Sequence, residues 1–335
     1  MPEFSSLELT EQLARLTTAA LEALKKWTFK TPEISLLKYR ENAVFKVSAE
    51  NKSFILRIHR ANYHSVEAVA SELAWIDALK RAHLKVPSVL PTKEQKRFTT
   101  VRVQGDSSLR IVDLFEWVEG ITVADALGTI ELTYVEPLFK EIGKAAAQLH
   151  NHSSRWQVPT EFKRHHWDIE GLLGEEPFWG KFWELGLLTR EQRELVLEAR
   201  DALKAQLQLY PKTKETYGLI HADTIPDNLI LSGEGLTLID FDDAGFGYYL
   251  FELATILRPI EDKPFYTLAK EAVLAGYQEH RALSQNDLDY LEGFQVARAL
   301  SYLGWFHDRP ELCGDVMRVR RAVEKACTHC RNFLA

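Results

Sequence analysis

Two short polar clusters follow two apolar runs in the second half of this chain. Asp223 and Asn228 lie in the stretch HADTIPDN, directly after the apolar stretch YGLI. Asp240 and Asp242 lie in the stretch DFDD, directly after LTLI. If both apolar runs are strands, the polar side chains project from strand ends and can converge on one ion or one reacting atom. Convergent carboxylates with a carboxamide are typical of a Mg²⁺ site, because Mg²⁺ prefers oxygen ligands.

The elements that must position these clusters begin with a small sheet. Alternating apolar residues and turn signals predict five strands and two amphipathic helices in the first third of the chain. The expected strands are 34–39, 43–47, 54–58, 97–103 and 109–117, and the expected helices are 9–27 and 66–81. The second and third strands are expected to form a hairpin, and Glu119-Gly120 is a natural exit from the last strand.

The rest of the chain is predicted to be mostly helical. An apolar stripe from Leu138 to Leu149 indicates one helix, with Pro137 expected near its first turn, where a missing N–H costs little. Thr189 and Gln192 have the spacing of a capping box. The other expected helices are 189–207, 248–257, 264–280, 287–306 and 316–334.

Composition argues against three classes of protein: nucleic-acid-binding, disulfide-rich and membrane-spanning. A net charge of −7 argues against nucleic acid as a partner, because phosphate binding needs a basic face. Three cysteines in 335 residues are too few for a disulfide scaffold. The first residues lack a secretory pattern, and no apolar run reaches the length of a membrane span. These features favour a cytoplasmic protein without a membrane partner. The sequence does not distinguish a monomer from a homodimer, and both stay open.

The motif HxDxxxxN, followed by an apolar strand and IDFD, resembles the catalytic and metal-binding segments of a known superfamily. It comprises aminoglycoside phosphotransferases, choline kinases and type II homoserine kinases. The resemblance implies an α+β, protein-kinase-like fold with two lobes. Residues 1–117 would form a small nucleotide-binding lobe with a five-stranded antiparallel sheet. Residues 118–335 would form a larger, mostly helical lobe for catalysis and substrate binding.

The resemblance also implies roles for the polar residues. Asp223 would accept or orient the proton of the acceptor hydroxyl, as phosphoryl transfer requires. Asn228 would hold Mg²⁺, and Asp240 would bridge the metal and the nucleotide phosphates. Asp242 is expected to be a second metal-binding carboxylate. His221 would brace the loop from beneath.

The resemblance also implies which residues of the first lobe bind the nucleotide. Arg57 stands where a phosphate-binding cation is expected, and Glu72 would pair with it. The alternative is that both are solvent-exposed charges. Asn42 would contact phosphates from a loop that lacks glycine, and Glu116 and Val118 would offer backbone groups to the purine.

The acceptor is expected to be small. Only a few residues separate Asp240 from the helix expected at 248–257, which leaves no room for the long activation segment on which protein kinases dock peptides. The insert 156–183 contains several tryptophans. Trp167 and Asp168 in this insert could hold an ammonium group, because aromatic faces beside carboxylates attract cations. The alternative is that the aromatic residues pack as core.

Several other residues are weaker candidates for substrate contacts. Trp305 and Arg298 could lie at the rim of the cleft. Two positions depart from the family pattern, namely Ala222, where many relatives have glycine, and Glu252, where an aspartate is common. Glu252 could support the catalytic loop or reach the substrate, and both alternatives stay open.

The pattern as a whole predicts an ATP- and Mg²⁺-dependent phosphotransferase that moves the γ-phosphate to a hydroxyl of a small molecule. The expected acceptors are an amino alcohol, an amino acid such as homoserine, a sugar or an aminoglycoside, with cationic molecules among them. One alternative is a compact protein Ser/Thr kinase of the bacterial stress-response type. Another is a catalytically silent, nucleotide-binding pseudokinase.

Overall fold

The computed structural model describes residues 3–40, 42–310 and 314–335. The chain divides into two compact units. Unit 1 comprises Met1–Gly120, Val158–Lys163 and Thr237–Asp242, and unit 2 comprises the remaining segments. The sequence predicted a single boundary between residues 117 and 118. It therefore placed Val158–Lys163 and Thr237–Asp242 in the second lobe, whereas the structure places them in unit 1. The second segment carries Asp240 and Asp242, so the predicted metal-binding aspartates belong to unit 1.

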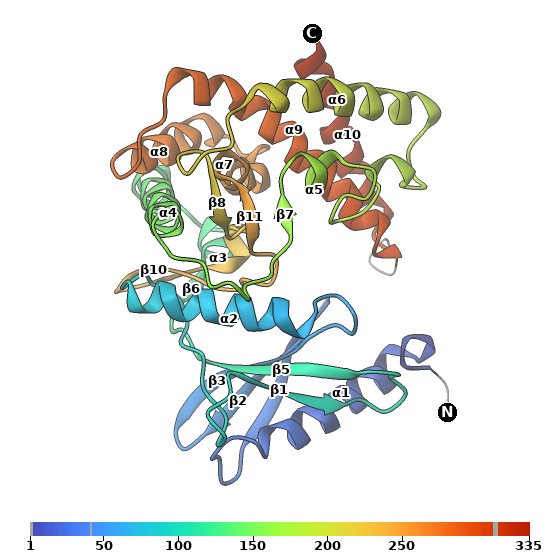
Figure 1. The fold of residues 1–335 in the computed structure, drawn as a ribbon, viewed down its shortest axis with the longest axis vertical. Coiled ribbons are helices and arrows are strands. Elements are labelled where there is room, and N and C mark those ends of the chain that lie inside the picture. Colours follow the sequence, from blue (N-terminus) through green and yellow to red (C-terminus); the bar gives the residue numbers. More distant parts are fainter. Residues whose placement is uncertain (1–2, 41, 311–313) are drawn as a thin grey trace. The chain divides into compact units, whose positions relative to one another are not determined.

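Unit 1 contains a five-stranded antiparallel sheet, as predicted (Figure 1). Its strands follow the spatial order β1-β2-β3-β5-β4. They are β1 (Glu33–Tyr39), β2 (Ala43–Ala49), β3 (Lys52–Ile58), β4 (Phe98–Arg102) and β5 (Leu109–Glu116). The β2–β3 hairpin turns at Glu50 and Asn51, both of which have positive φ angles. Arg57 on β3 lies opposite Asp113 on β5, a register that is important for the site.

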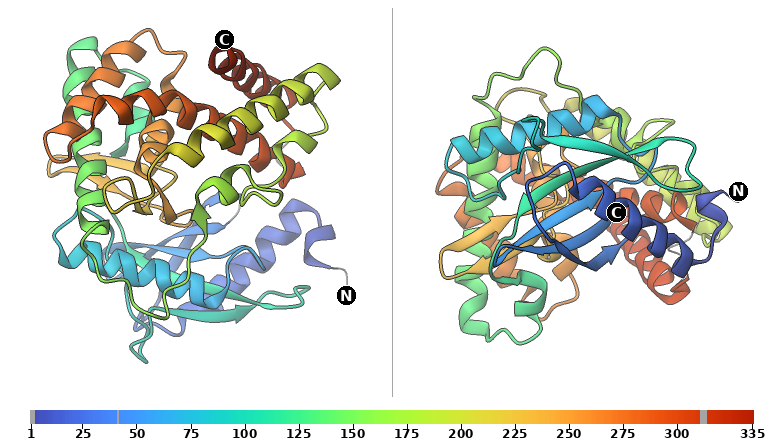
Figure 2. Two further views of the ribbon diagram at one scale, coloured as in Figure 1. Left: turned by 45° about the horizontal axis from the view of Figure 1, so that its top comes forward. Right: turned by 90° about the horizontal axis from the view of Figure 1, so that it is seen from below.

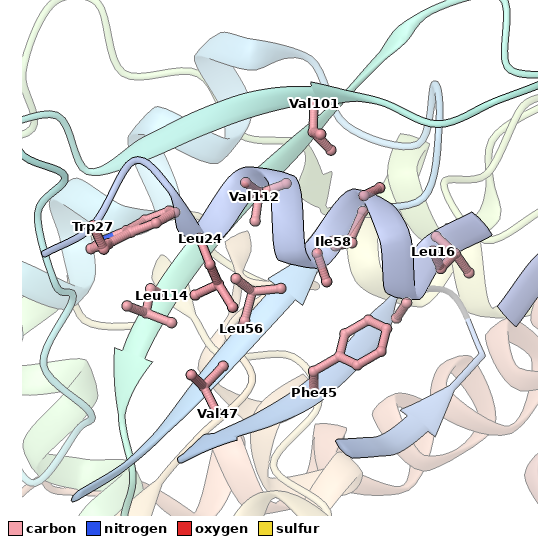
Figure 3. Close-up of a cluster of buried hydrophobic side chains, with 14 of the residues drawn as sticks. Leu16, Leu24, Trp27, Phe45, Val47, Leu56, Ile58, Val101, Val112 and Leu114 are labelled. Atoms are coloured by element: carbon pink, nitrogen blue, oxygen red, sulfur yellow. The ribbon is translucent and has the colours of Figure 1, made fainter. Parts of the chain in front are cut away.

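Two helices accompany this sheet, α1 (Leu9–Leu24) and α2 (Val66–Arg81), and a short 3₁₀ turn, η1 (Phe4–Ser6), precedes them. Buried side chains of α1 share one hydrophobic cluster with the sheet, as Figure 3 shows for Leu16 and Leu24 beside Phe45 and Leu56. The apolar spacing of α1 therefore has a direct structural reason, because its buried positions recur at helical intervals. Helix α2 begins at Ser65, whose hydroxyl accepts a hydrogen bond from the Ala68 N–H.

Unit 2 is mostly helical (Figure 1). Its helices are α3 (Val123–Leu127), α4 (Leu132–Ser153), α5 (Ile169–Leu173), α6 (Arg190–Leu209), α7 (Tyr249–Leu257), α8 (Tyr266–Gln278), α9 (Gln285–His307) and α10 (Val316–Leu334). The predicted capping box at Thr189 and Gln192 is present. Helix α10 lies against α9 and α6, and Figure 2 shows its dark red ribbon beside the yellow-green α6.

Helices α4 and α8 approach each other closely through glycine. A Cβ atom on Gly143 would lie 2.0 Å from the Val273 carbonyl oxygen, so no larger residue fits without a shift. The expectation for Pro137 in α4 was wrong. The helix begins at Leu132, which places Pro137 beyond the first turn, inside the helix. Because proline has no N–H, the hydrogen bond from position 137 to the preceding turn is missing there.

Short strands in unit 2 lead into the functional loops. Strand β11 (Gly245–Tyr248) runs parallel to β7 (His166–Trp167) and antiparallel to β8 (Tyr217–Ile220). Strand β6 (Ile121–Thr122) pairs with β9 (Leu229–Ser232). Strand β10 (Gly235–Leu238) follows, and its last two residues belong to unit 1. Short 3₁₀ turns complete the unit: η2 (Phe182–Glu184), η3 (Pro226–Asn228) and η4 (Arg258–Ile260). None of the helices in the described part of the chain is long and apolar enough to cross a membrane.

Candidate active site

Glu252 of α7 holds the loop that follows β8. Its Oε2 atom accepts hydrogen bonds from the backbone N–H groups of His221 and Ala222, at 2.6 and 3.0 Å. Its Oε1 atom accepts one from the Thr224 hydroxyl at 2.5 Å. Ala222 has a φ angle of 64°, in the left-handed region that favours glycine. The left-handed turn at Ala222 is therefore stabilised by three hydrogen bonds to the buried Glu252 carboxylate.

Glu252 stays ionised although it is fully buried. Burial raises the pKa of this carboxyl. Hydrogen bonds from His150 and the Thr224 hydroxyl, together with the electrostatic effect of His221 and His150, outweigh burial and lower the pKa to about 2. A substrate contact does not fit a carboxylate that is sealed from solvent and bonded to the loop. The structure favours the other predicted alternative, in which Glu252 supports the catalytic loop.

Asp223 is held at both carboxylate oxygens. Asn228 donates to Oδ2 at 2.8 Å and also to the Asp223 carbonyl oxygen at 2.9 Å. Arg298 donates to Oδ1 at 3.2 Å. The Asp223 side chain is 21% exposed, whereas Asn228 is buried. Asp223 is therefore oriented and accessible, and Asn228 has its carbonyl oxygen left as the atom that could bind a metal.

His221 lies against the loop that it was expected to brace. The ring is fully buried, and its Nδ1 accepts a hydrogen bond from the Asp223 N–H at 3.3 Å. This contact links the loop backbone to the imidazole beneath it.

Arg298 of α9 connects Asp223 to the end of the DFDD stretch. Its guanidinium lies over the indole ring of Trp179, 4.5 Å from the ring centroid. The Trp179 Nε1–H donates to Asp243 Oδ1 at 3.1 Å. Arg298 was expected only at the rim of the cleft. Its pairing with Asp223 was missed, because 75 residues separate the two and no local pattern joins them.

A second cluster lies in unit 1 around Arg57. The Arg57 guanidinium donates to Glu72 at 2.6 Å and to both carboxylate oxygens of Asp113, at 2.7 and 3.1 Å. Since all three side chains are buried, Arg57 and Glu72 are not surface charges, and that alternative is wrong. Asp113 was missed in the sequence. It reads there as one residue of an apolar strand, and only the strand register places it opposite Arg57.

The DFDD stretch meets this cluster through its first and third residues. Arg57 Nη1 lies 3.7 Å from Oδ1 of Asp240 and also 3.7 Å from Oδ1 of Asp242. Phe241, between them, packs edge-on against Trp75, with ring centroids 5.6 Å apart. The Asp240 side chain is 38% exposed and its φ angle is 63°. Phe241 therefore anchors the segment while Asp240 faces solvent.

Two histidines that the sequence did not single out also face this cluster. His59 lies between Asp113, at 2.8 Å, and Asp242, at 3.5 Å, and His64 lies 3.7 Å from Asp242. Burial raises the pKa of Asp242, but the two histidines and Arg57 outweigh burial and hold the pKa well below its usual range. Asp242 is thus an ionised carboxylate, as a metal ligand must be.

Within residues 3–40, 42–310 and 314–335, no three or more His, Cys, Asp or Glu side chains form a group that could hold a metal by themselves. Any metal near Asp240 and Asp242 would therefore take other ligands as well. This agrees with the usual behaviour of Mg²⁺, which keeps several waters and binds phosphate oxygens beside one or two carboxylates.

The remaining nucleotide candidates lie in unit 1. Asn42 is buried, and its side-chain oxygen accepts a hydrogen bond from the Arg60 N–H at 3.0 Å. The Glu116 N–H donates to the Ser88 carbonyl, so this N–H group is not available to a purine. Val118, two residues further on, is half-buried. A purine contact through the Glu116 backbone would therefore have to use its carbonyl oxygen.

The tryptophan-rich insert packs as core. Trp167 is fully buried and stacks on Phe251, with centroids 5.5 Å apart, and its Nε1–H donates to the Asp243 carbonyl oxygen at 2.9 Å. Asp168 caps α5 through the Gly171 N–H and pairs with Lys212 at 2.7 Å. Neither residue is arranged to hold an ammonium group, so that interpretation of Trp167 and Asp168 is wrong.

Trp305 of α9 is also largely buried, at 9% exposure. It stacks on Tyr302, with ring centroids 5.6 Å apart and planes tilted by 15°. The guanidinium of Arg258, on η4, also lies over the Tyr302 ring, 3.6 Å from its centroid. Trp305 thus packs in a group of aromatic and arginine side chains.

Comparisons with known proteins agree with this geometry. Residues 35–293 match the model of the family described as the phosphotransferase enzyme family. The solved structure of a microcompartment-associated aminopropanol kinase is 32% identical, covers 95% of each chain and has a TM-score of 0.78. The structure of amicoumacin kinase hAmiN, at 21% identity with a TM-score of 0.78, covers 96% of each chain and shows the same fold.

Curated relatives with named activities are kinases. Amicoumacin kinase of Bacillus subtilis (strain 168) is 24% identical over 87% of this chain and 84% of its own length. Homoserine kinase of Rhizobium etli (strain CIAT 652) is 26% identical over 87% of this chain and 86% of its own. The predicted resemblance, the kinase-like fold and the predicted class of small-molecule phosphotransferase are confirmed. The chain belongs to the phosphotransferase enzyme family.

Proposed function

We propose that this protein transfers the γ-phosphate of Mg-ATP to a hydroxyl group of a small amino alcohol or hydroxy amino acid. The similarity to an aminopropanol kinase structure and to several homoserine kinases supports this range of acceptors. A similar fold has been solved with AMP-PNP and Ca²⁺, which supports a nucleotide triphosphate and a divalent metal.

The observation that carries the proposal is the state of Asp223. Its carboxylate is fixed at both oxygens by Asn228 and Arg298, yet it keeps 21% of its side-chain surface exposed. A fixed and accessible carboxylate can accept the hydrogen bond of an acceptor hydroxyl and align its oxygen with the phosphorus atom. Positioning of this kind is the main protein contribution to phosphoryl transfer, since no covalent enzyme intermediate is needed.

Arg57, Asp240 and Asp242 form the phosphate-side group. Arg57 is a permanently charged donor that its carboxylate neighbours hold in place, and it can bind phosphate oxygens. Asp240 and Asp242 would hold Mg²⁺, and Asn228 would contribute its carbonyl oxygen. When bound, the metal neutralises negative charge that develops on the phosphate oxygens. Asn42 and the backbone near Val118 are proposed contacts for the nucleotide.

The proposal is tested by replacing Asp223 with asparagine. Asp223→Asn should lower kcat by about 10²- to 10⁴-fold, the range typical of a lost proton-accepting group. Binding of Mg-AMP-PNP, measured by calorimetry, should remain close to that of the wild type. Asp227→Asn is the matched control, because Asp227 lies four residues away and is exposed. Turnover retained by Asp223→Asn would remove Asp223 from the reaction.

The acceptor class is tested by ADP release. Wild-type protein with Mg-ATP is screened against amino alcohols, hydroxy amino acids, sugars and aminoglycosides. Turnover with members of the first two groups supports the proposal, whereas turnover restricted to sugars or aminoglycosides contradicts it. Radiolabel transfer to proteins of a lysate, without transfer to any small molecule, would favour the protein kinase alternative.

A further inference from the structure

A pocket of about 530 Å³ opens in unit 1 between α2 and the segment that leads into β4. Four of its lining residues are apolar, namely Ala70, Val89, Pro91 and Phe98. Pro91 is exposed and the other three are half-buried, so a ligand in the pocket would cover apolar surface that water now reaches. Small-molecule sites commonly have volumes of about 300–1,000 Å³ and largely apolar walls. The pocket therefore has the size and lining of such a site, and none of its lining residues is assigned above to catalysis or nucleotide binding.

The rim of the pocket carries two cations. Lys96 and Arg97 line it together with one acidic residue, Asp77. The Arg97 Nε–H donates to Asp77 at 2.5 Å, which uses one of the five N–H bonds of the guanidinium. Lys96 Nζ lies 3.2 Å from Glu94, and both side chains of this pair are exposed. Exposed pairs are weak, so Lys96 and the remaining N–H bonds of Arg97 are able to bind an anion.

The segment around the pocket is basic, although the chain as a whole is acidic. Residues 77–97 include six lysines and arginines but two acidic residues, whereas the chain has a net charge of −7. The basic residues of this segment are all exposed, including Lys80, Arg81, Lys85 and Lys93. A local excess of positive charge attracts anions and repels cations.

We infer that this pocket is a regulatory site for a small organic anion that has an apolar ring. The ring packs on Val89, Pro91 and Phe98, and the anionic group binds Lys96 and Arg97. An anion without a ring would leave the apolar wall uncovered. A cation with the same ring would be repelled by the rim.

Helix α2 connects the pocket to the phosphate side of the proposed active site. Ala70 of the pocket wall lies two residues before Glu72, and Glu72 is paired with Arg57 at 2.6 Å. The pocket is present in the arrangement in which this ion pair is formed. A ligand that fits the pocket stabilises that arrangement, so Arg57 is held for phosphate binding in a larger fraction of the molecules.

The opposite wall is bonded to the strand that leads to the proposed purine contacts. Val89 pairs with Phe115 of β5 in an isolated antiparallel bridge. Beside this bridge, the Glu116 N–H donates to the Ser88 carbonyl oxygen at 3.0 Å. A ligand in the pocket therefore contacts a segment that is fixed to β5. Occupancy should raise the affinity for nucleotide, and this regulatory part of the inference rests on the proposed function.

Three probes test the ligand class by calorimetry, with the full chain and without nucleotide. 1-Naphthoate has the ring and the anion, 1-naphthylmethylammonium has the ring with a cation, and acetate has the anion alone. The wild type should bind 1-naphthoate at least about tenfold more tightly than either other probe, because only 1-naphthoate combines apolar contact with hydrogen bonds from charged groups. A wild type that does not bind 1-naphthoate, or that binds both naphthalene probes equally, would overturn the inference.

Two variants test where 1-naphthoate binds. Ala70→Leu fills the pocket and should weaken binding by about tenfold or more, since leucine occupies the volume that the ring needs. Ala14→Leu, at an exposed position of α1, is its control. Arg97→Gln should also weaken binding by about tenfold, and Arg102→Gln, at an exposed position of β4, should not. Arg97 is itself exposed, so Arg97→Gln remains a test if the melting curve of Ala70→Leu shows that it does not fold. Unchanged binding in either folded variant would place the probe elsewhere and overturn the inference.

The regulatory role is tested by the affinity for Mg-AMP-PNP. Saturating 1-naphthoate should raise this affinity by about fivefold in the wild type, at the low end of typical coupling between two sites, and should not change it in Ala70→Leu. An unchanged or lower affinity in the wild type would overturn the regulatory role. A loss that persists in Ala70→Leu would place the probe in the nucleotide site. Because probe binding is measured without nucleotide, failure of the proposed function would leave that result unaffected.

Discussion

Arg57 and Glu72 form an ion pair that solvent does not reach, with 2.6 Å between Arg57 Nη2 and Glu72 Oε1. Replacing Glu72 with glutamine leaves Arg57 hydrogen-bonded to Asp113, with Asp240 and Asp242 each 3.7 Å from its Nη1. The variant loses one charge-assisted hydrogen bond while other carboxylates still compensate Arg57, so we expect a loss of about 2 kcal/mol in the free energy of unfolding. We also expect the affinity for Mg-AMP-PNP to fall by about tenfold, because Arg57 is less well held for phosphate binding.

The measurements for Glu72→Gln are urea unfolding and calorimetric titration. Glu22→Gln is the control, since Glu22 pairs with Lys25 on the exposed side of α1. Wild-type nucleotide affinity in Glu72→Gln would contradict a role for this ion pair in phosphate binding.

Divalent metal should be required for turnover. Removal of divalent ions with EDTA is expected to abolish ADP release, and added Mg²⁺ should restore it. Asp240 and Asp242 carry negative charge like the nucleotide phosphates, so a cation must lie between them to neutralise the repulsion. Asp240→Asn should raise the Mg²⁺ concentration for half-maximal activity by about tenfold or more. Turnover that survives EDTA, or an unchanged Mg²⁺ requirement in Asp240→Asn, would remove the metal from this site. Asp227→Asn serves again as the control.

Ala222 should tolerate glycine but not valine. Its φ angle of 64° suits glycine, whereas a β-branched residue is strongly disfavoured in this region. Ala222→Gly should change the free energy of unfolding by less than about 1 kcal/mol, because relief of backbone strain offsets the added freedom of the unfolded chain. Ala222→Val should lose about 2 kcal/mol or more, together with most of the activity. Differential scanning calorimetry tests both variants.

Ala14→Val is the control for Ala222→Val. Ala14 is exposed in α1, so valine there should cost only the small difference in helix propensity, about 0.5 kcal/mol. If Ala222→Val and Ala14→Val are equally stable, the strain at Ala222 has no energetic importance.

Glu252→Gln tests the support beneath the catalytic loop. Glutamine keeps one acceptor oxygen for the two backbone N–H groups but loses the charge, which strengthens such hydrogen bonds. We expect about 2 kcal/mol less stability and a lower kcat, with little change in nucleotide affinity. Glu279→Gln, at an exposed pair with Lys140, should change none of these quantities. A Glu252→Gln protein that melts and turns over like the wild type would contradict the supporting role.

The stability that Glu252 provides should depend on pH in one direction. The pKa of this carboxyl is about 2 in the folded protein, against about 4.5 for a glutamate exposed to water. A depressed folded pKa stabilises the protein fully above pH 4.5, and this contribution is lost as the pH falls from 4.5 towards 2. The difference in unfolding free energy between wild type and Glu252→Gln should therefore shrink over this window. A difference that stays constant or grows there would contradict this assignment.

Local patterns predicted much of the fold. Helices α2 and α10 begin and end at the predicted residues, because Ser65 and Asp315 cap them directly before an amphipathic run. The five strands were found within a few residues, since alternation and turn residues mark strand ends. Pro137 was placed wrongly, because the additional turn before it carries no capping side chain that could mark its start.

The candidate site also contains residues that the sequence could reveal and residues that it could not. Asp223 and Asn228 are bonded to each other and lie five residues apart, so one motif revealed both. Asp113, by contrast, meets Arg57 across 56 residues, and a strand register brings them together. Trp167 beside Asp168 suits a cation site or a core equally well in the sequence, and only the packing of unit 2 distinguishes the two. Side chains that act through distant partners could not be assigned from spacing.

The hydrogen bonds from Trp167 and Trp179 to Asp243 have a consequence for engineering. The insert that carries these tryptophans resembles an interchangeable specificity loop, because it lies outside the catalytic motifs. Its two indole groups nevertheless fix the residue directly after Asp242, and the Trp179 ring also covers one face of the Arg298 guanidinium. Transplanting an insert from a relative to change the acceptor would therefore disturb turnover itself, unless both indole donors are transplanted with it.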